Sequence, residues 1–353
     1  MPQFNSPRFE RFLIQAQTGG VGIINNSSGT WTPTGAQVIR VNDGSTSVLP
    51  VVQLINQDWK TGSRSAVAGI SGRKNARFSI NNFPVIPSGT PGTASDMDVL
   101  LAGIFGQVGT ISSGVSVTYT FSDNTFVPIT LIKFQHLLPT LTQRVMGGAT
   151  VEQASFTFNQ NTFMCSFSGG GFYVISNDNF TNEDSTGKMG LTTFPLETQL
   201  GAGNTTVHGA ILTGFAGSAT FASNLMTTIT APIISMSCTV KTGNILYTDP
   251  FGTVYPSIQG GGLRKITLAV EFMDTDSAAL ITLKNAANSK VPFNVSVTVG
   301  TIAGSMMTFT INQVQIEIPS MTDDTARVKT AFAESEAHAT VPGNIDDFSI
   351  VMT

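Results

Sequence analysis

Hydrophobic and small polar residues alternate along much of this chain. The alternation is clearest in four runs, Val115–Phe121, Ala154–Phe158, Lys265–Phe272 and Val291–Val299. A period of two indicates a β-strand with one face buried and one face exposed. Turn-forming stretches rich in Gly, Ser and Asn separate these runs. The pattern therefore predicts a mostly β protein.

Only two segments have the features of helices, Asp96–Gly106 and Asp274–Lys290. Each begins with two aspartates that are two residues apart. Residues at that spacing point in different directions on a helix, so a catalytic carboxylate pair is disfavoured. Acidic residues in a first turn instead suit the helix dipole, and we expect them to cap the helix N-termini. Gly106 is placed to end the first helix.

The two helices belong to a pattern that occurs twice. Each follows a strand that is introduced by a glycine and basic residues, Gly72–Lys74 or Gly262–Lys265, about 190 residues apart in the sequence. Each also precedes two further strand-like runs. We interpret this as a tandem duplication, with a first β module at 1–180 and a second at 181–353 that includes a C-terminal tail. Chance recurrence is the alternative, because strand–helix–strand order is common.

Composition supports a folded chain of 353 residues, with 41% hydrophobic and only 11% charged residues. Disordered chains have the reverse balance. The formal net charge of −4 disfavours a general nucleic-acid-binding protein, which would normally be basic. The first 77 residues are rich in Lys and Arg, whereas Glu317 and the residues after it are mostly acidic. This asymmetry predicts either a head-to-tail contact between copies or two separate solvated faces.

No residue pattern typical of a catalytic or metal site stands out. Cys165 and Cys238 lie in apparent strands and are expected to be buried free thiols. His136, His208 and His338 have no metal-ligand spacing. Nucleophile-elbow, Walker and dinucleotide-binding motifs are missing from the sequence. We therefore predict that the protein is not an enzyme and uses no cofactor or metal.

The N-terminal segment carries charges where a secretory signal peptide needs an apolar run, and no stretch is apolar over the length of a bilayer. We therefore expect synthesis in a cytoplasm and no membrane association.

Three segments together resemble the tail tube proteins (major tail proteins) of long-tailed, non-contractile bacteriophages. They are Thr90–Gly106, Gly147–Phe172 and Ala231–Pro319, and their order carries the resemblance over about two thirds of the chain. The resemblance implies β-sandwich modules, each with one short flanking helix, that close into a ring β-barrel on oligomerisation. Stacked rings then form the tube through which the DNA genome is ejected. A duplicated chain favours a trimer with pseudo-sixfold symmetry over a hexamer.

The resemblance also implies a place and a set of partners. The chain would assemble in the host bacterial cytoplasm and reside in the virion tail. Its partners would be itself, the tail tip and tail terminator proteins, the tape measure protein and then double-stranded DNA, which passes through the lumen without specific binding. The related tubes of contractile injection machines belong to the same class. The alternative is a non-enzymatic β-sandwich tail decoration or receptor-binding protein, for which Trp31 and Trp59 beside predicted loops are candidate contacts.

Within this interpretation, polar strand faces are candidates for the channel lining. The sequence places Gln313, Gln315 and Glu317 on one strand face, and it places Gln153 on another face with Glu152 opposite; Glu271 is a further candidate. Ordinary solvent-facing strands are the alternative explanation. A neutral to acidic lining would let DNA pass, because basic groups bind phosphates.

Two long loops, Asn56–Gly72 and Thr248–Gly262, are candidates for contacts between rings. The residues expected to make these contacts are Lys60, Arg64, Arg73, Lys74, Asp249 and Tyr255.

Overall fold

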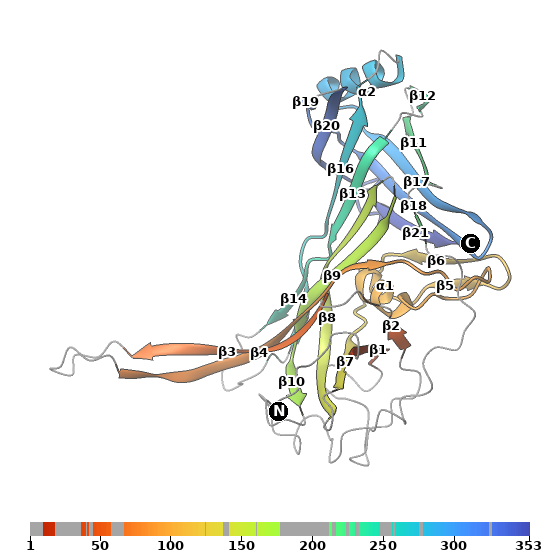
Figure 1. Cartoon of the computed structure of the whole chain (residues 1–353). Coiled ribbons are helices and arrows are strands. Elements are labelled where there is room, and N and C mark those ends of the chain that lie inside the picture. The colour runs from red at the N-terminus through yellow and green to blue at the C-terminus, as the bar shows by residue number, and fades with distance from the viewer. Residues whose placement is uncertain are drawn as a thin grey trace.

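The computed structural model of the chain is mostly β, as the alternation predicted, and two helices accompany the strands (Figure 1). It describes residues 10–17, 37–39, 41, 45–57, 67–123, 125–136, 141–159, 161–176, 212–213, 217–223, 226–229, 233–247, 256, 258–274, 278–324 and 327–353.

The largest sheet has twelve strands, and all of its pairings are antiparallel. Eight of them follow one another from edge to edge: β3 (Thr46–Gln57), β4 (Val67–Pro84), β9 (Phe163–Gly171), β8 (Leu141–Asn159), β13 (Ile233–Lys241), β16 (Lys265–Met273), β20 (Arg327–Glu336) and β19 (Ser320–Asp324). The remaining four extend from the first part of β8: β10 (Tyr173–Ser176), β7 (Ile129–His136), β1 (Glu10–Ala16) and β2 (Gln37–Ile39). The long β8 therefore takes part in two ladders.

A second sheet has seven strands, and a separate pair forms a small hairpin. The seven follow the order β12 (Met226–Ile229), β11 (Ser218–Ser223), β17 (Phe293–Ile302), β18 (Ser305–Val314), β21 (Phe348–Met352), β6 (Ser116–Thr120) and β5 (Thr110–Ser112). The hairpin consists of β14 (Asn244–Tyr247) and β15 (Ile258–Gly261). Among the described residues neither large sheet closes on itself. Hydrogen-bonded ladders cross the predicted module boundary at residue 180, in the pairs β8–β13 and β6–β21.

The strand pairings repeat along the chain. In the first half the pairing order is β2–β1–β7–β8–β10, and in the second half it is β12–β11–β17–β18–β21. The order β3–β4–β9–β8 likewise matches β13–β16–β20–β19. Only the hairpins β5–β6 and β14–β15 lack a counterpart in this comparison.

Both predicted helices are present, as α1 (Asp98–Phe105) and α2 (Ala278–Ser289). Gly106 ends α1 in the left-handed conformation, with φ 73°. The predicted aspartate capping is wrong for α1, because its N-cap residue is Met97, which makes no side-chain hydrogen bond. Asp98 instead accepts a 2.7 Å hydrogen bond from the Tyr119 hydroxyl. Asp274, which precedes α2, accepts hydrogen bonds from the Lys284 side chain and the Thr330 hydroxyl.

One hydrophobic core connects the two halves of the chain. Phe156 of β8 lies 5.2 Å from Phe309 of β18, measured between ring centroids. Phe105 of α1 stacks on Phe348 of β21 at 5.7 Å. Helix α1 is buried along almost its whole length, whereas α2 lies at one end of the molecule and buries one side. Cys165 and Cys238 are buried free thiols, as predicted; burial raises the pKa of Cys238 to about 12.

Candidate functional site

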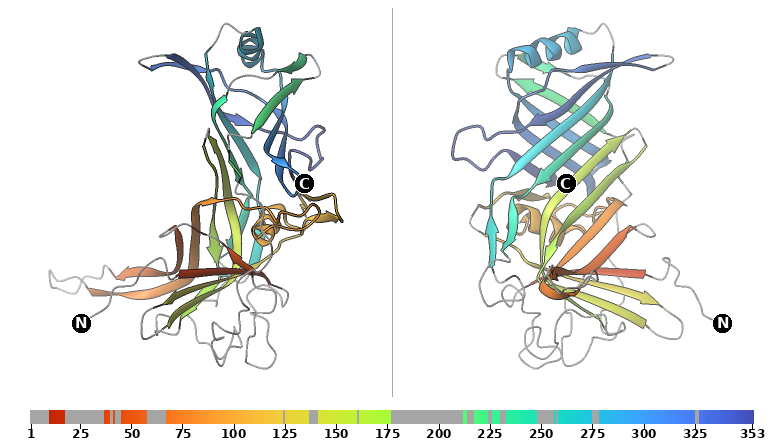
Figure 2. Two further views of the ribbon diagram at one scale, coloured as in Figure 1. Left: turned by 45° about the vertical axis from the view of Figure 1, so that its right-hand side comes forward. Right: turned by 90° about the vertical axis from the view of Figure 1, so that its left-hand side faces the viewer.

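One face of the central strands is lined by small hydroxyl and amide side chains; we call it the polar face. The alternate residues of the same strands, such as Phe156, Cys238 and Leu268, are buried in the core. The right-hand view of Figure 2 shows these strands side by side. The polar face carries Gln153, Ser155, Thr157, Ser166, Ser168, Ser235, Ser237, Thr239, Lys241, Thr267, Ala269 and Glu271, all partly or fully exposed.

Hydroxyl groups on this face contact each other across the strands. Ser47 and Ser79 hydroxyls lie 2.8 Å apart, between β3 and β4. Ser155 and Thr239 hydroxyls lie 3.4 Å apart, between β8 of the first half and β13 of the second. These contacts make the face a continuous polar surface across residue 180.

Most of the charges on or beside the polar face are paired. Arg77 Nη1 lies 2.5 Å from Glu152 Oε2, and Lys329 Nζ lies 3.4 Å from Glu271 Oε1. Glu271 also accepts a 3.1 Å hydrogen bond from the Ser235 hydroxyl. These two cations therefore have a carboxylate partner, which weakens their attraction for external anions.

The same pairing occurs at the end of β16, where Lys265 forms an ion pair with Glu336. Hydrogen bonding between them raises the pKa of Lys265 and lowers that of Glu336, so both charged forms are favoured.

Three of the predicted channel residues, Glu152, Gln153 and Glu271, lie on the polar face. The expectation that Glu152 points away from Gln153 is wrong. The register of β8 against β9 shifts between Val151 and Gln153, which is a β-bulge. An extra residue at a bulge changes the alternation, and Glu152 consequently reaches Arg77 on the polar face.

The predicted row of Gln313, Gln315 and Glu317 is not on one strand face. Strand β18 ends at Val314, and Gln313 has a positive φ of 48°. Gln315 forms an isolated bridge with Glu336 of the other sheet, and the Glu317 carboxylate lies 3.6 Å from Lys290. The chain changes sheets at this point, so a regular period of two does not continue through it.

The outer half of the β3–β4 hairpin, residues 51–57 and 67–74, reaches away from the rest of the molecule (Figure 1), and we call it the arm. It exposes apolar side chains on β3 and β4, at Val51 (40%), Val52 (48%), Leu54 (65%), Ile55 (50%) and Ile70 (53%). Arg73 and Lys74, two of the predicted inter-ring residues, lie on this arm. The other four, Lys60, Arg64, Asp249 and Tyr255, lie outside the described residues, as do His208, Trp31 and Trp59.

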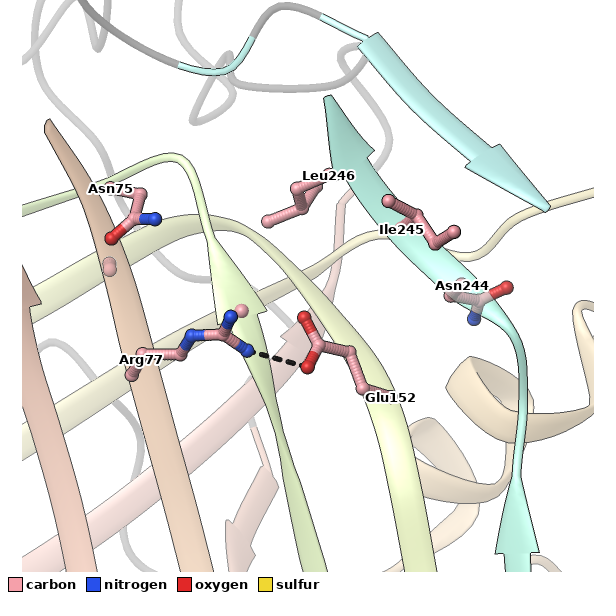
Figure 3. Close-up of a pocket in the computed structure, with 8 residues that line it drawn as sticks. Asn75, Arg77, Glu152, Asn244, Ile245 and Leu246 are labelled. Atoms are coloured by element: carbon pink, nitrogen blue, oxygen red, sulfur yellow. Dashed lines mark hydrogen bonds and ion pairs between the residues drawn. The ribbon is translucent and has the colours of Figure 1, made fainter. Parts of the chain in front are cut away.

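The β14–β15 hairpin lies beside the polar face and covers part of the first half. Asn244, Ile245 and Leu246 of β14 line a pocket of about 230 Å³ together with Arg77 and Glu152 (Figure 3). Gly170 is required under this contact, because a Cβ there would lie 2.9 Å from both the Leu246 side chain and Glu152 Oε1. A hairpin of the second half therefore packs on the sheet of the first.

Arg264 makes a further connection between the two halves, which sequence patterns did not indicate. Its guanidinium binds Asp347 through two 2.9 Å hydrogen bonds and Asp123 through one of 2.9 Å. It also lies 3.8 Å above the Phe121 ring. Burial acts to lower the pKa of Arg264, but the two carboxylates outweigh it and raise the pKa. The signal in the sequence was Arg264 in the repeated glycine-basic segment.

Within the described ranges, no group of three or more His, Cys, Asp and Glu side chains is placed to hold a metal ion. The described helices are also too short or too polar to cross a bilayer. No protein-family model and no curated protein matches this chain.

Proposed function

We propose that this chain is the structural subunit of a tail tube, in which three copies form a ring and the polar faces line a channel for DNA. The observation that carries the proposal is the repeated strand order. Four strands, β3–β4–β9–β8, are followed in the same sheet by four with the same connections, β13–β16–β20–β19. A tandem pair of modules at 1–180 and 181–353 accounts for this order.

The geometry of the repeat favours a closed ring. Each half begins with a strand that runs in the same direction, because the four intervening pairings are all antiparallel. A further copy can therefore be added at either edge with the same relation. Three chains supply 24 strands, which at ~4.8 Å spacing and ~40° tilt close at a diameter of about 48 Å. A ring also pairs the edge strands, which would otherwise promote aggregation.

The chemistry of the polar face suits passage rather than binding. Proteins that hold DNA do so largely through cations that contact phosphates. Arg77 and Lys329 are instead paired with carboxylates, and the surrounding side chains are mostly Ser and Thr. Such a lining makes few strong contacts with a moving polyanion.

We further propose that the arm contacts the next ring in the tube. A two-stranded hairpin is only marginally stable by itself, and the arm exposes apolar residues that a partner would cover. Reversing Lys60 and Arg64 to Glu should weaken the stacking of rings and leave each ring intact. Tubes of unchanged length from this variant would contradict the arm assignment.

Electron microscopy of the purified protein, combined with its mass in solution, tests the proposed function. We expect rings or tubes with a central hole, and a single-ring mass of roughly 112 kDa, three times the chain mass of 37.2 kDa. A mass of six chains would reject the pseudo-sixfold trimer and keep the tube. A chain that stays monomeric at high concentration would instead support a tail decoration or receptor-binding protein.

A further inference from the structure

We propose that Thr46–Leu49 of one copy pair antiparallel with Ser320–Asp323 of the next copy, with Leu49 directly opposite Ser320. This inference rests on the proposed ring and specifies the strands and the register of the seam between copies. Among the described residues, β3 pairs only with β4 and β19 only with β20, so each has one unpaired edge. The occupant of each edge is then a second copy of this chain.

The seam inside the chain supplies the template. Strand β8 ends the first set of four strands, and β13 begins the second set. They pair over seven residues, with Thr239 opposite Ser155 and Cys238 opposite Phe156. The seam between copies joins the corresponding strands, β19 as the counterpart of β8 and β3 as the counterpart of β13.

Buried residues of β4 and β16 show which positions correspond in the two sets. Ile80 lies opposite Phe167 in the β4–β9 ladder, and Val270 lies opposite Phe332 in the β16–β20 ladder. All four side chains are 5% exposed or less. Ile80 therefore corresponds to Val270 in the second half.

The same correspondence extends to the edge strand. Thr46 lies opposite Ile80, and Met236 lies opposite Val270, so Thr46 corresponds to Met236. Both ladders continue without a register shift for the next three residues. Leu49 is therefore the counterpart of Thr239.

Strand β19 is aligned with β8 by sequence and by pairing. Residues 151–158 read VEQASFTF, and residues 316–323 read IEIPSMTD, with Glu, Ser and Thr at matching positions. Ser155 lies opposite Ser166 of β9, and Ser320 lies opposite Ala331 of β20, the neighbour of the buried Phe332. Ser320 is thus the counterpart of Ser155, and it should face Leu49 as Ser155 faces Thr239.

Two further observations agree with this register. Met321 is 61% exposed, although its counterpart Phe156 is fully buried, so a neighbouring copy would remove an apolar side chain from water. Pro50 and Pro319 fall opposite each other at the end of the pairing. Neither residue can donate a backbone hydrogen bond, and the ladder between copies therefore stops there. The seam is shorter than the seven-residue ladder inside the chain.

Cysteine cross-linking tests the register. In the Leu49→Cys/Ser320→Cys variant, the two cysteines of neighbouring copies lie opposite each other on one face, within reach of a disulfide. Mild oxidation should give covalent dimers and trimers, with no species larger than three chains from isolated rings. The control, Leu49→Cys/Met321→Cys, places its cysteines on opposite faces and should cross-link at least tenfold less. Cys165 and Cys238 are buried and should not contribute.

A second variant tests the seam by a different route. Met321→Asp should abolish rings and leave the far-ultraviolet circular dichroism and the urea midpoint of the monomer unchanged. Ile281→Asp on α2 is the control, because Ile281 is 52% exposed and distant from either edge strand in the sequence and the sheet order; this variant should still form rings.

The outcomes separate this inference from the proposed function. Rings without the Leu49–Ser320 cross-link, or rings from Met321→Asp, would overturn the seam and keep the tube. A wild-type chain that forms no ring would overturn both.

Discussion

Replacing Arg264 by methionine should destabilise the folded chain strongly, because three groups lose their shared partner. Arg264 is 17% exposed and Asp347 is 13% exposed, and their two hydrogen bonds are both 2.9 Å long. Removing one member of a buried ion pair typically costs about 3–5 kcal/mol. The more exposed Asp123 adds little, and the contact with Phe121 adds about 1 kcal/mol. With partial solvation of the pair, we expect a loss of about 3 kcal/mol.

Urea unfolding of the monomer, followed by circular dichroism, measures this loss. The matched control is Lys265→Met at the next position, where an exposed lysine pairs with Glu336 and no measurable change is expected. The variant Arg264→Met/Asp347→Asn should lose less than the sum of its two single variants, since the residues act on each other. Equal losses for Arg264→Met and Lys265→Met, or strictly additive single losses, would refute the reasoning.

Three other substitutions test separate parts of the structure. Asp98→Asn should stabilise the chain at pH 7 and change little at pH 3: burial raises the pKa of the Asp98 carboxyl above its usual 3.8, so the native state loses stability as pH rises through that raised pKa, and the amide keeps an acceptor for the Tyr119 hydroxyl; urea midpoints at both pH values measure this, and equal midpoints at pH 7 would contradict it. Glu152→Gln combined with Glu271→Gln should increase DNA retention by assembled tubes at least tenfold at 50 mM salt, because two cations lose their carboxylates; filter binding against salt concentration measures it, and unchanged retention would argue against the channel assignment. Gly103→Ala should cost about 1–3 kcal/mol in urea unfolding despite the better helix propensity of alanine, since its Cβ would lie 2.8 Å from two side-chain atoms of β7 and β8; a stabilised variant would show that the core can adjust.

Local patterns predicted the elements well where one rule governed a whole segment. The run Lys265–Phe272 alternates without interruption, and it forms β16 with one buried face. Gly106 ends α1 because only the left-handed conformation closes the last turn there. In each case the decisive information lies within a few neighbouring residues.

The same rules failed where tertiary structure alters the period. The bulge at Glu152 and the positive φ at Gln313 each add one residue to a strand, and one residue reverses every assignment of faces beyond it. The partners of Arg264 are also distant, because Asp123 and Asp347 lie far from it in the sequence. Sequence periodicity carries no information about such contacts.

A fused pair of modules changes how the proposed ring forms. Six separate modules would need six seams between molecules, whereas three fused chains need only three. The β8–β13 seam has seven paired residues and forms as part of the monomer fold. The proposed seam between copies has about four, and prolines bound it on both edge strands. A short edge limits pairing in wrong registers and with foreign strands. Chain folding can then be completed before assembly begins, and each closing step depends on a contact weak enough to reverse an incorrect addition.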